Sequence, residues 1–147
     1  MIRQRISRTD DTTIYRIVVE ELIPYSRTRM DPNELTRPAI VRRLNRMTTF
    51  VWGRGSSRKP CGFISFMVRD RRLMIDMLAV ERGYQSRGLG AQLLQAAERY
   101  GRTHQCTAAL LYVDEGNMRA HRFYERQGYA LDGYVPSLRC FRLAKSL

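Results

Sequence analysis

The sequence predicts one α+β domain, spanning residues 1–147, whose elements follow the order βααβββαβαββ. A chain of 147 residues with 44% hydrophobic residues is suited to a single domain with a buried core. Three neighbouring segments between residues 48 and 80 are rich in β-branched and aromatic residues, which indicates strands. Segments on both sides carry apolar residues at helical spacing. We therefore expect about seven strands and about four helices.

The first elements are predicted to be a short strand and an amphipathic helix. Apolar and polar residues alternate at the start of residues 2–7, which is typical of a strand. A helix is expected over residues 10–23, ending before Pro24, because its apolar residues recur at helical spacing. These apolar residues are Ile14, Val18 and Leu22.

A second helix is predicted to begin at the sequence DPNE. Asp31 suits the N-cap, Pro32 the first helical position, and Glu34 can reach back toward the cap. We expect Pro38 to interrupt this helix, because proline breaks helical hydrogen bonding. The helix should then resume over residues 40–44.

An antiparallel meander of three strands is predicted next. Its strands are expected over residues 48–54, 61–69 and 72–80. Residues 55–60, GSSRKP, and the short sequence RDR have the composition of the two connecting turns.

Alternating helices and strands are predicted for the rest of the chain. A helix runs from about residue 88 to Tyr100 and ends at Gly101, and a strand follows over residues 107–113. A second helix runs from Asn117 to Gln127, with Gly128 as a left-handed C-terminal cap. Two closing strands are expected over residues 129–134 and 138–144.

The net charge is the unusual bulk property of the chain. The sequence has 26 Lys+Arg against 14 Asp+Glu, a formal charge of +12, and all of the basic residues except Lys59 and Lys145 are arginine. Such a balance favours anionic partners such as nucleotides, tRNA or an acidic protein. The alternative is that codon bias placed arginine on a solvated surface. The basic residues are spread along the chain, so no discrete patch is predicted.

The cysteines and the apolar segments exclude several classes of protein. Cys61, Cys106 and Cys140 are odd in number, widely spaced and without a C-x-x-C pair, so neither a disulfide framework nor a metal site is expected. The first residues lack the apolar region of a signal peptide, and no apolar stretch approaches the length of a membrane span. We expect a cytoplasmic protein without a membrane partner.

A glycine-rich turn precedes the helix that starts near residue 88. The sequence YQSRGLGAQLL contains Gln85-x-x-Gly88-x-Gly90, but Leu93 stands where a dinucleotide fingerprint needs glycine, and no P-loop lysine follows. Glycines at a helix start let backbone N–H groups approach an anion such as a diphosphate. The alternative is that Gly88 and Gly90 only permit a tight turn and close packing.

A second motif lies about thirty residues further along the chain. Asn117 begins the next helix, and Ala120, Phe123 and Tyr124 are spaced three and four apart on its inner face. An aromatic residue in that position usually fills a core. The two motifs occur together and in order, separated by one helix and one strand.

Together the two motifs resemble those of the GNAT superfamily of acetyl-CoA-dependent N-acetyltransferases. Residues 78–94, LAVERGYQSRGLGAQLL, are similar to its pyrophosphate-binding motif Arg/Gln-x-x-Gly-x-Gly/Ala. Residues 117–129, NMRAHRFYERQGY, are similar to its later segment N-x-x-A-x-x-(F/L)-Y-x-x-x-G-(F/Y). The resemblance implies a GNAT-like fold, with one mixed, mostly antiparallel central sheet flanked by helices. The first fifty residues, which form the acceptor side in this superfamily, match only in element order.

The resemblance also implies a binding site for acetyl-CoA. Its diphosphate would be held by backbone N–H groups of the turn, from Gln85, Ser86, Arg87, Gly88, Leu89 and Gly90. The Arg87 side chain, and also Arg82, could add charge-assisted hydrogen bonds. Val80 would pair with the pantetheine arm like an added strand, and Asn117 would contact the same arm.

The implied reaction is direct attack of an amine on the thioester. The backbone N–H of Leu78 would stabilise the charge that develops on the thioester oxygen, and Tyr124 would give a proton to the departing thiolate. An alkyl amine with a pKa of about 10.4 must lose a proton first. Asp76, inside the apolar sequence LMIDML, is the predicted catalytic base, whereas its alternative role is to pair with an arginine. Glu20 and Glu21 are rival candidates.

These expectations define a leading function and its alternatives. The leading prediction is an N-acetyltransferase that acts on a primary amine of a small molecule or peptide. Acetylation of aminoacyl-tRNA is an alternative that the +12 charge favours, although tRNA is not the preferred partner. Polycationic acceptors are disfavoured by the same charge. A CoA-binding module with little catalysis is the third reading. Many members of the superfamily dimerise through their last strands, which leaves a homodimer open.

Overall fold

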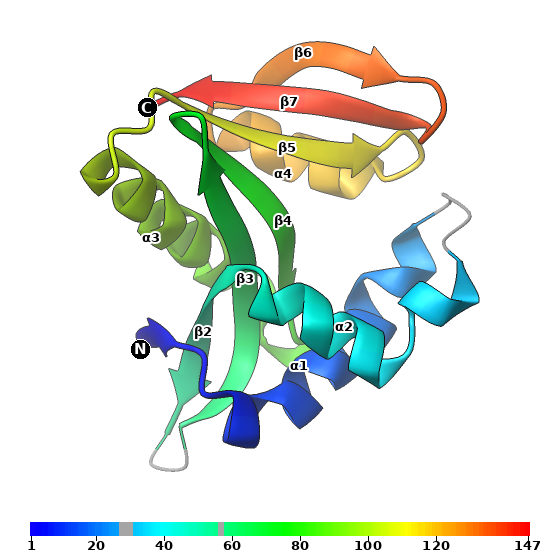
Figure 1. Cartoon of the computed structure of the whole chain (residues 1–147), viewed down its shortest axis with the longest axis vertical. Coiled ribbons are helices and arrows are strands. Elements are labelled where there is room, and N and C mark those ends of the chain that lie inside the picture. Colours follow the sequence, from blue (N-terminus) through cyan, green and yellow to red (C-terminus); the bar gives the residue numbers. More distant parts are fainter. Residues whose placement is uncertain (27–30, 56–57) are drawn as a thin grey trace.

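The computed structural model describes residues 1–26, 31–55 and 58–147. In this part of the chain a single seven-stranded sheet, of order β1-β2-β3-β4-β5-β7-β6, is flanked by four α-helices (Figure 1). The predicted α+β architecture and its element order are therefore confirmed. Residues 56–57 of the predicted turn over residues 55–60 lie outside the described residues. None of the helices that the structure describes is long and apolar enough to cross a membrane.

The first four strands form an antiparallel sheet. Strand β1 (Ile2–Gln4) pairs with β2, and the meander predicted from residues 48–80 is confirmed as three consecutive strands. These strands are β2 (Thr48–Arg54), β3 (Lys59–Arg69) and β4 (Arg72–Val80). Alternate side chains of β2 and β4 are buried, as the period of two along a strand requires.

The last three strands form the other half of the sheet. Strand β5 (Ala108–Asp114) runs parallel to β4, and the hairpin of β6 (Ala130–Val135) and β7 (Cys140–Ser146) adds to β5 through β7. The parallel pairing with β4 makes the sheet mixed, in agreement with the expected mostly antiparallel arrangement.

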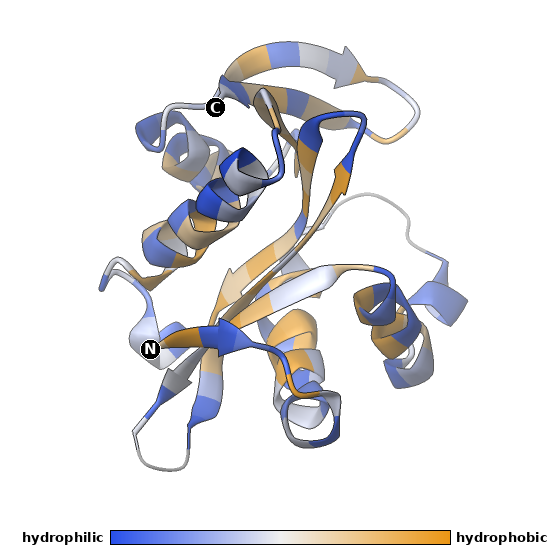
Figure 2. Cartoon of the chain, turned by 60° about the vertical axis from the view of Figure 1, so that its left-hand side comes forward, coloured by the Kyte–Doolittle hydropathy of each residue, from blue (hydrophilic) through white to orange (hydrophobic). Residues whose placement is uncertain are grey.

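Helices cover both faces of the sheet, and their apolar sides turn toward it (Figure 2). Helices α1 (Ser7–Glu21) and α2 (Arg37–Asn45) enclose one core with β2, β3 and β4. Helix α3 (Leu89–Thr103) encloses the larger core on the opposite face, and α4 (Met118–Arg126) packs aromatic residues against that core. Burial of these apolar faces is the main stabilising contribution to the fold.

Helix α1 begins earlier than the sequence pattern predicts. The carboxylate of Asp10 accepts a hydrogen bond from the backbone N–H of Ile6 at 2.7 Å, which satisfies a free donor at the helix start. The helix therefore starts at Ser7 and not at residue 10, and the first strand already ends at Gln4.

The predicted capping box at Asp31 gives only a short 3-10 turn, Pro32–Glu34. Helix α2 starts instead after Thr36, whose hydroxyl accepts a hydrogen bond from the N–H of Ala39. Pro38 lies in the first turn of α2, where its missing N–H costs nothing, so the prediction that it interrupts a helix is wrong.

The ends of α3 and α4 show two roles of glycine. Gly101, predicted to end α3, lies inside the helix, and a Cβ there would be 3.3 Å from Leu73, so it permits close packing on β4. Gly128 follows α4 with φ of +95°, which confirms the predicted left-handed cap. Asn117, predicted as the first residue of this helix, is instead its N-cap: the side chain accepts a hydrogen bond from the N–H of Ala120, and α4 begins at Met118.

Candidate active site

The sheet forks between β4 and β5. The two strands pair only at Arg72, Leu73 and Met74 and then diverge (Figure 1). The register of β3 and β4 shifts between Ser65 and Phe66, which leaves Asp76 as the extra residue of a β-bulge. A bulge bends its strand, so it accounts for the divergence directly after Met74.

Beyond Met74, no strand among the described residues pairs with the edge of β4 that faces the fork. The N–H of Glu81 donates to Cys61 of β3 at 2.8 Å. Because successive amides along a strand point to opposite edges, the N–H groups of Leu78 and Val80 point away from β3 and into the fork. This edge can take an extended ligand as an additional strand.

A cavity of about 480 Å³ occupies the fork, and we call it the fork cavity. It lies between α1, β4, the start of α3 and α4. Its lining consists of Glu21, Leu22, Tyr25, Leu78, Ala79, Val80, Tyr84, Gln85, Ser86, Gly88, Leu89, Gly90, Ala91, Asn117, Arg119, Ala120, Phe123, Tyr124, Arg126 and Gln127.

The N-terminus of α3 opens into the fork cavity without a capping side chain. Gly88 is the N-cap, with φ of +79°, and no acidic residue lies in the first turn. By contrast, Thr36 and Asn117 cap α2 and α4 with their side chains. The free N–H groups and the helix dipole at the start of α3 therefore favour an anion at this end of the cavity.

Close contact between α3 and α4 sets the width of the cavity beside this turn. A Cβ on Gly90 would lie 3.4 Å from Cζ of Phe123. This is an ordinary van der Waals distance, and both helix starts line the same cavity.

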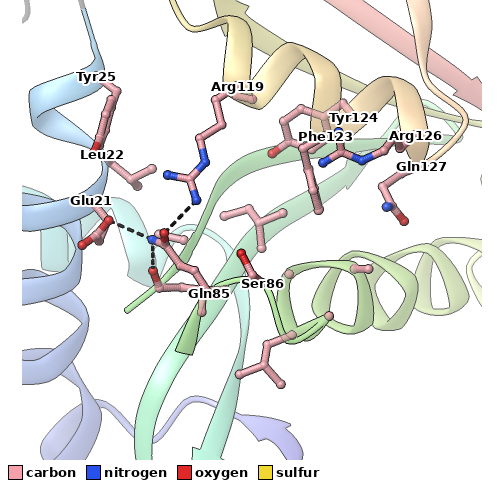
Figure 3. Close-up of a pocket in the computed structure, with 18 of the residues that line it drawn as sticks. Glu21, Leu22, Tyr25, Gln85, Ser86, Arg119, Phe123, Tyr124, Arg126 and Gln127 are labelled. Carbon is pink, nitrogen blue, oxygen red and sulfur yellow. Dashed lines mark hydrogen bonds between the residues drawn. The ribbon is translucent and has the colours of Figure 1, made fainter. Parts of the chain in front are cut away.

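The side chain of Gln85 spans the fork (Figure 3). Its Nε2 donates to the carbonyl oxygen of Val80 at 2.8 Å and to Glu21 Oε2 at 2.9 Å, and its Oε1 accepts from Arg119 Nη2 at 2.9 Å. The sequence motif predicted a role for its backbone N–H only. The side chain links α1, β4 and α4 across the cavity.

Glu21 brings a buried carboxylate to the fork cavity. It is the last residue of α1, its side chain is 6% exposed, and the Arg82 guanidinium lies 3.8 Å from Oε1. The neighbouring Glu20 is half exposed and pairs with Arg16, so Glu21 is the carboxylate of this helix end that faces the cavity.

Tyr124 reaches the cavity from the last turn of α4. Its ring is half buried and makes edge contacts with Phe123 and Tyr129. Burial raises the pKa of Tyr124 above its ordinary value, so the hydroxyl stays protonated at neutral pH. A protonated hydroxyl can donate a hydrogen bond or a proton.

Most of the residues predicted for the site line this one cavity. They are Leu78, Val80, Gln85, Ser86, Gly88, Leu89, Gly90, Asn117 and Tyr124. Arg87 is absent from the lining, and its guanidinium lies 5.4 Å from the centre of the Tyr84 ring.

Asp76 lies at a different cavity. Its carboxylate forms a two-point ion pair with Arg43 of α2, at 2.7 and 2.8 Å, and lines a hollow of about 360 Å³ together with Met47, Met74 and Tyr112. Pairing with an arginine is the alternative role that the sequence left open.

Sequence reasoning missed several residues of the fork cavity. Tyr84 and Arg119 each lie beside a recognised motif, and their positions next to it were the only available indication. Leu22 and Tyr25 follow the first helix, where no pattern pointed to a site.

The forked mixed sheet and the uncapped start of α3 lie within a segment that matches a known protein family. The sequence model of the acetyltransferase (GNAT) family matches residues 12–129, which include both motifs and the whole fork. The chain therefore belongs to the GNAT family of acetyltransferases.

Two curated relatives share part of the sequence. A probable N-acetyltransferase of Mycobacterium tuberculosis, Rv2775, is 30% identical over 86 residues, which cover 56% of this chain and 48% of that protein. A probable spermine N(1)-acetyltransferase of Bacillus subtilis subsp. natto is 29% identical over 66 residues, which cover 44% of this chain and 43% of that protein. The match thus spans slightly less than half the length of each relative.

The fold as a whole matches a solved structure. The PaiA N-acetyltransferase of Thermoplasma acidophilum, solved in complex with coenzyme A, has a TM-score of 0.81 and 17% identity. The alignment covers 100% of this chain and 99% of that one, so the GNAT-like fold predicted from the sequence is confirmed over the full length.

Proposed function

We propose that this protein transfers the acetyl group of acetyl-CoA to a primary amine of a small molecule or peptide. The observation that carries the proposal is the fork cavity itself. It combines the uncapped start of α3, the free edge of β4 and the Tyr124 hydroxyl in one space. The helix start suits the diphosphate of the cofactor, and the strand edge suits its extended arm. The hydroxyl suits the departing thiolate at the end of that arm.

Cofactor binding is assigned to the turn and the strand edge. Backbone N–H groups over residues 85–90 would hold the diphosphate, and the left-handed conformation of Gly88 would turn them toward its oxygens. The N–H of Val80 would pair with the pantetheine arm, and Asn117 lies on the opposite wall. Arg119 is a further cation near the anion end of the cavity.

Three groups of the chain would act on the reacting atoms. When bound, acetyl-CoA supplies a thioester carbonyl carbon that forms a bond to the amine nitrogen while its bond to sulfur breaks. The N–H of Leu78 donates to the carbonyl oxygen as negative charge develops there. The hydroxyl of Tyr124 holds the proton that the departing thiolate needs. A carboxylate of the acceptor side takes the proton that the amine loses.

We propose Glu21 for this last role, with Asp76 as the alternative. Glu21 is buried at the fork cavity and would face an acceptor that enters beside α1. Asp76 is held by Arg43, and its carboxylate lies at the second cavity. A Glu21→Gln variant should therefore lose more turnover at neutral pH than Asp76→Asn does, and its loss should shrink as the pH approaches about 10, where the amine is deprotonated without a base.

Tyr124→Phe tests the proposed chemistry. Removal of the hydroxyl should lower turnover by about 100-fold, the usual contribution of a positioned acid, with the affinity for acetyl-CoA unchanged. Turnover is measured by transfer from labelled acetyl-CoA to pooled amines and peptides, and affinity by calorimetric titration. Equal turnover in the variant would remove Tyr124 from the mechanism, whereas bound acetyl-CoA without any product would favour a CoA-binding module.

Aminoacyl-tRNA is the second candidate acceptor because of the +12 charge. The assay therefore includes aminoacyl-tRNA and spermine and is run at two salt concentrations. Phosphate contacts make tRNA binding fall steeply with salt, so a salt-sensitive product on tRNA would favour this candidate. Spermine is included because the name of the Bacillus relative contains it. Spermine is a polycation, so the positive charge of this chain should disfavour its binding.

A further inference from the structure

One buried carboxylate of the large core lies outside the fork cavity. Glu98 of α3 has a side chain that is 3% exposed. Its Oε2 accepts a hydrogen bond from the Tyr129 hydroxyl at 2.7 Å, and both of its oxygens lie 3.1 Å from Nζ of Lys145 in β7. Replacement of a buried ion pair by apolar residues often leaves stability unchanged. Stability alone therefore does not explain why Glu98 and Lys145 are present in this core.

Tyr129 connects this carboxylate to Tyr124. The backbone N–H of Tyr129 donates to the carbonyl oxygen of Tyr124 at 3.0 Å, which is the six-to-one hydrogen bond of a Schellman motif closed by Gly128. The two tyrosine rings are also in edge contact, with centroids 5.8 Å apart. Tyr129 therefore contacts both the backbone and the ring of Tyr124.

Lys145 closes the arrangement from the sheet. Its Nζ lies 5.7 Å from the centre of the Tyr129 ring. The Lys145 side chain also packs beside Gly128, since a Cβ on Gly128 would lie 3.5 Å from Cε of Lys145. Burial and the adjacent Glu98 carboxylate raise the pKa of Tyr129, so its hydroxyl stays protonated and keeps donating to Glu98.

The Tyr124 hydroxyl itself lacks such a support. Burial raises its pKa, and none of the residues that the structure describes forms a hydrogen bond with this hydroxyl. Among the described residues, ring contacts and the end of α4 set its place in the fork cavity. Reacting groups are sensitive to placement, since a shift of about 1 Å can cost about 100-fold in rate.

We propose that Glu98 and Lys145 are positioning residues, which hold Tyr129 and through it fix the Tyr124 hydroxyl in the fork cavity. The inference rests on the proposed function, because it assigns Tyr124 a part in the reaction. It deepens that function by giving the charged pair in the core a role in turnover.

Tyr129→Phe is the test variant, because it removes one hydroxyl and keeps the ring. Turnover should fall about tenfold, while KM for acetyl-CoA and for the acceptor stays within twofold. Glu98→Gln should have the same effect. Tyr15→Phe is the matched control, since the Tyr15 hydroxyl donates to the carbonyl oxygen of Leu35 at 3.1 Å and lies away from Tyr124. It should reduce thermal stability by a similar amount and leave turnover unchanged.

A double-mutant cycle separates positioning from general destabilisation. In a Tyr124→Phe background, Tyr129→Phe should cause no further loss of turnover, because the hydroxyl that it positions is gone. Additive losses, a rise in KM without a fall in turnover, or an equal loss in Tyr15→Phe would overturn the positioning role. If Tyr124→Phe lowers turnover and Tyr129→Phe does not, the positioning role alone fails. If Tyr124→Phe has no effect, the role of Tyr124 fails and the positioning role fails with it.

Discussion

Two adjacent aspartates at the start of α1 are both buried and both paired with arginine. Asp10 lies 2.7 Å from Arg3, and Asp11 lies 2.6 Å from Arg5. Burial alone would raise the pKa of Asp11, but hydrogen bonds from Arg5 and Ser7 outweigh it and hold the pKa below its ordinary value. These pairs attach the first strand to the first helix.

Asp11→Asn should lower the free energy of unfolding by about 3 kcal/mol at pH 7, because it leaves Arg5 buried without its partner. The pKa of Asp11 is lower in the folded state, so its contribution is full above the unfolded pKa of about 3.9. It is lost as the pH falls through the folded pKa. Urea unfolding of both proteins from pH 7 to about pH 2 checks this. An equal difference at both ends of that range would contradict the prediction.

Single residues mark the limit of what the sequence predicts about the site. The motifs identified the turn and Tyr124, because short segments with fixed spacing carry their own geometry. The partner of Asp76 could not be predicted, since Arg43 lies 33 residues away and only the packing of α2 brings it close. The bridge made by the Gln85 side chain likewise depends on where α1 and α4 end.

Among the elements, strands were predicted more accurately than helix ends. The β-branched and aromatic composition of residues 48–54 and 72–80, together with the adjoining turn sequences, predicted the bounds of β2 and β4 directly. Helix ends depend on which polar group reaches the free N–H groups, and neighbouring candidates compete. Helix α2 begins after Thr36 and not at Asp31, because Thr36 caps it. Helix α3 continues past its predicted end at Gly101, where glycine permits close packing on Leu73.

The first turn of α3 offers a matched pair of glycine substitutions. Gly88→Ala should lower the free energy of unfolding by about 1 kcal/mol, because φ of +79° is unfavourable for alanine. If the backbone relaxes from this φ, the free N–H groups turn away from the diphosphate, so acetyl-CoA binding should weaken about tenfold. Gly90→Ala should change stability by less than about 0.5 kcal/mol, because the helix favours alanine and Phe123 leaves van der Waals room.

Thermal unfolding and calorimetric titration of both variants measure these effects. The two substitutions add the same methyl group two residues apart, so general crowding of the turn would affect both alike. Equal losses of acetyl-CoA affinity would therefore contradict a specific role for the backbone conformation at Gly88.

At the scale of the whole molecule, five of the described arginines are engaged in close ion pairs. They come from β1, the connection after β1, α1, α2 and β7, and each lies 3.0 Å or less from a carboxylate; they are Arg3, Arg5, Arg16, Arg43 and Arg142. The total charge of +12 is known from composition, but which arginines are paired depends on the fold. The salt dependence of acceptor binding therefore reports on the arginines that are not paired in this way.

Acetyl-CoA should stabilise the whole fold, because the fork cavity is lined by β4 from one half of the sheet and by α4, which connects two strands of the other half. A ligand at a free concentration of 100 times its dissociation constant raises the free energy of unfolding by about 2.7 kcal/mol. For a chain of this size, that corresponds to a rise in Tm of roughly 5 to 10 °C. Thermal unfolding over a range of acetyl-CoA concentrations checks this, with sodium sulfate at equal ionic strength as the control for anion effects. A Tm that does not rise with concentration would contradict binding in the fork.

The narrow junction at Arg72, Leu73 and Met74 also has a mechanical consequence. Two parts of a sheet that are joined by three residue pairs can bend relative to each other more easily than strands paired along their full length. Amide hydrogens of β5 and β7 should then exchange with solvent as one unit, separately from those of β2 and β3. A ligand bound across this junction should make the amides of the two parts exchange together. Hydrogen exchange would therefore detect binding in the fork from amides that do not contact the ligand.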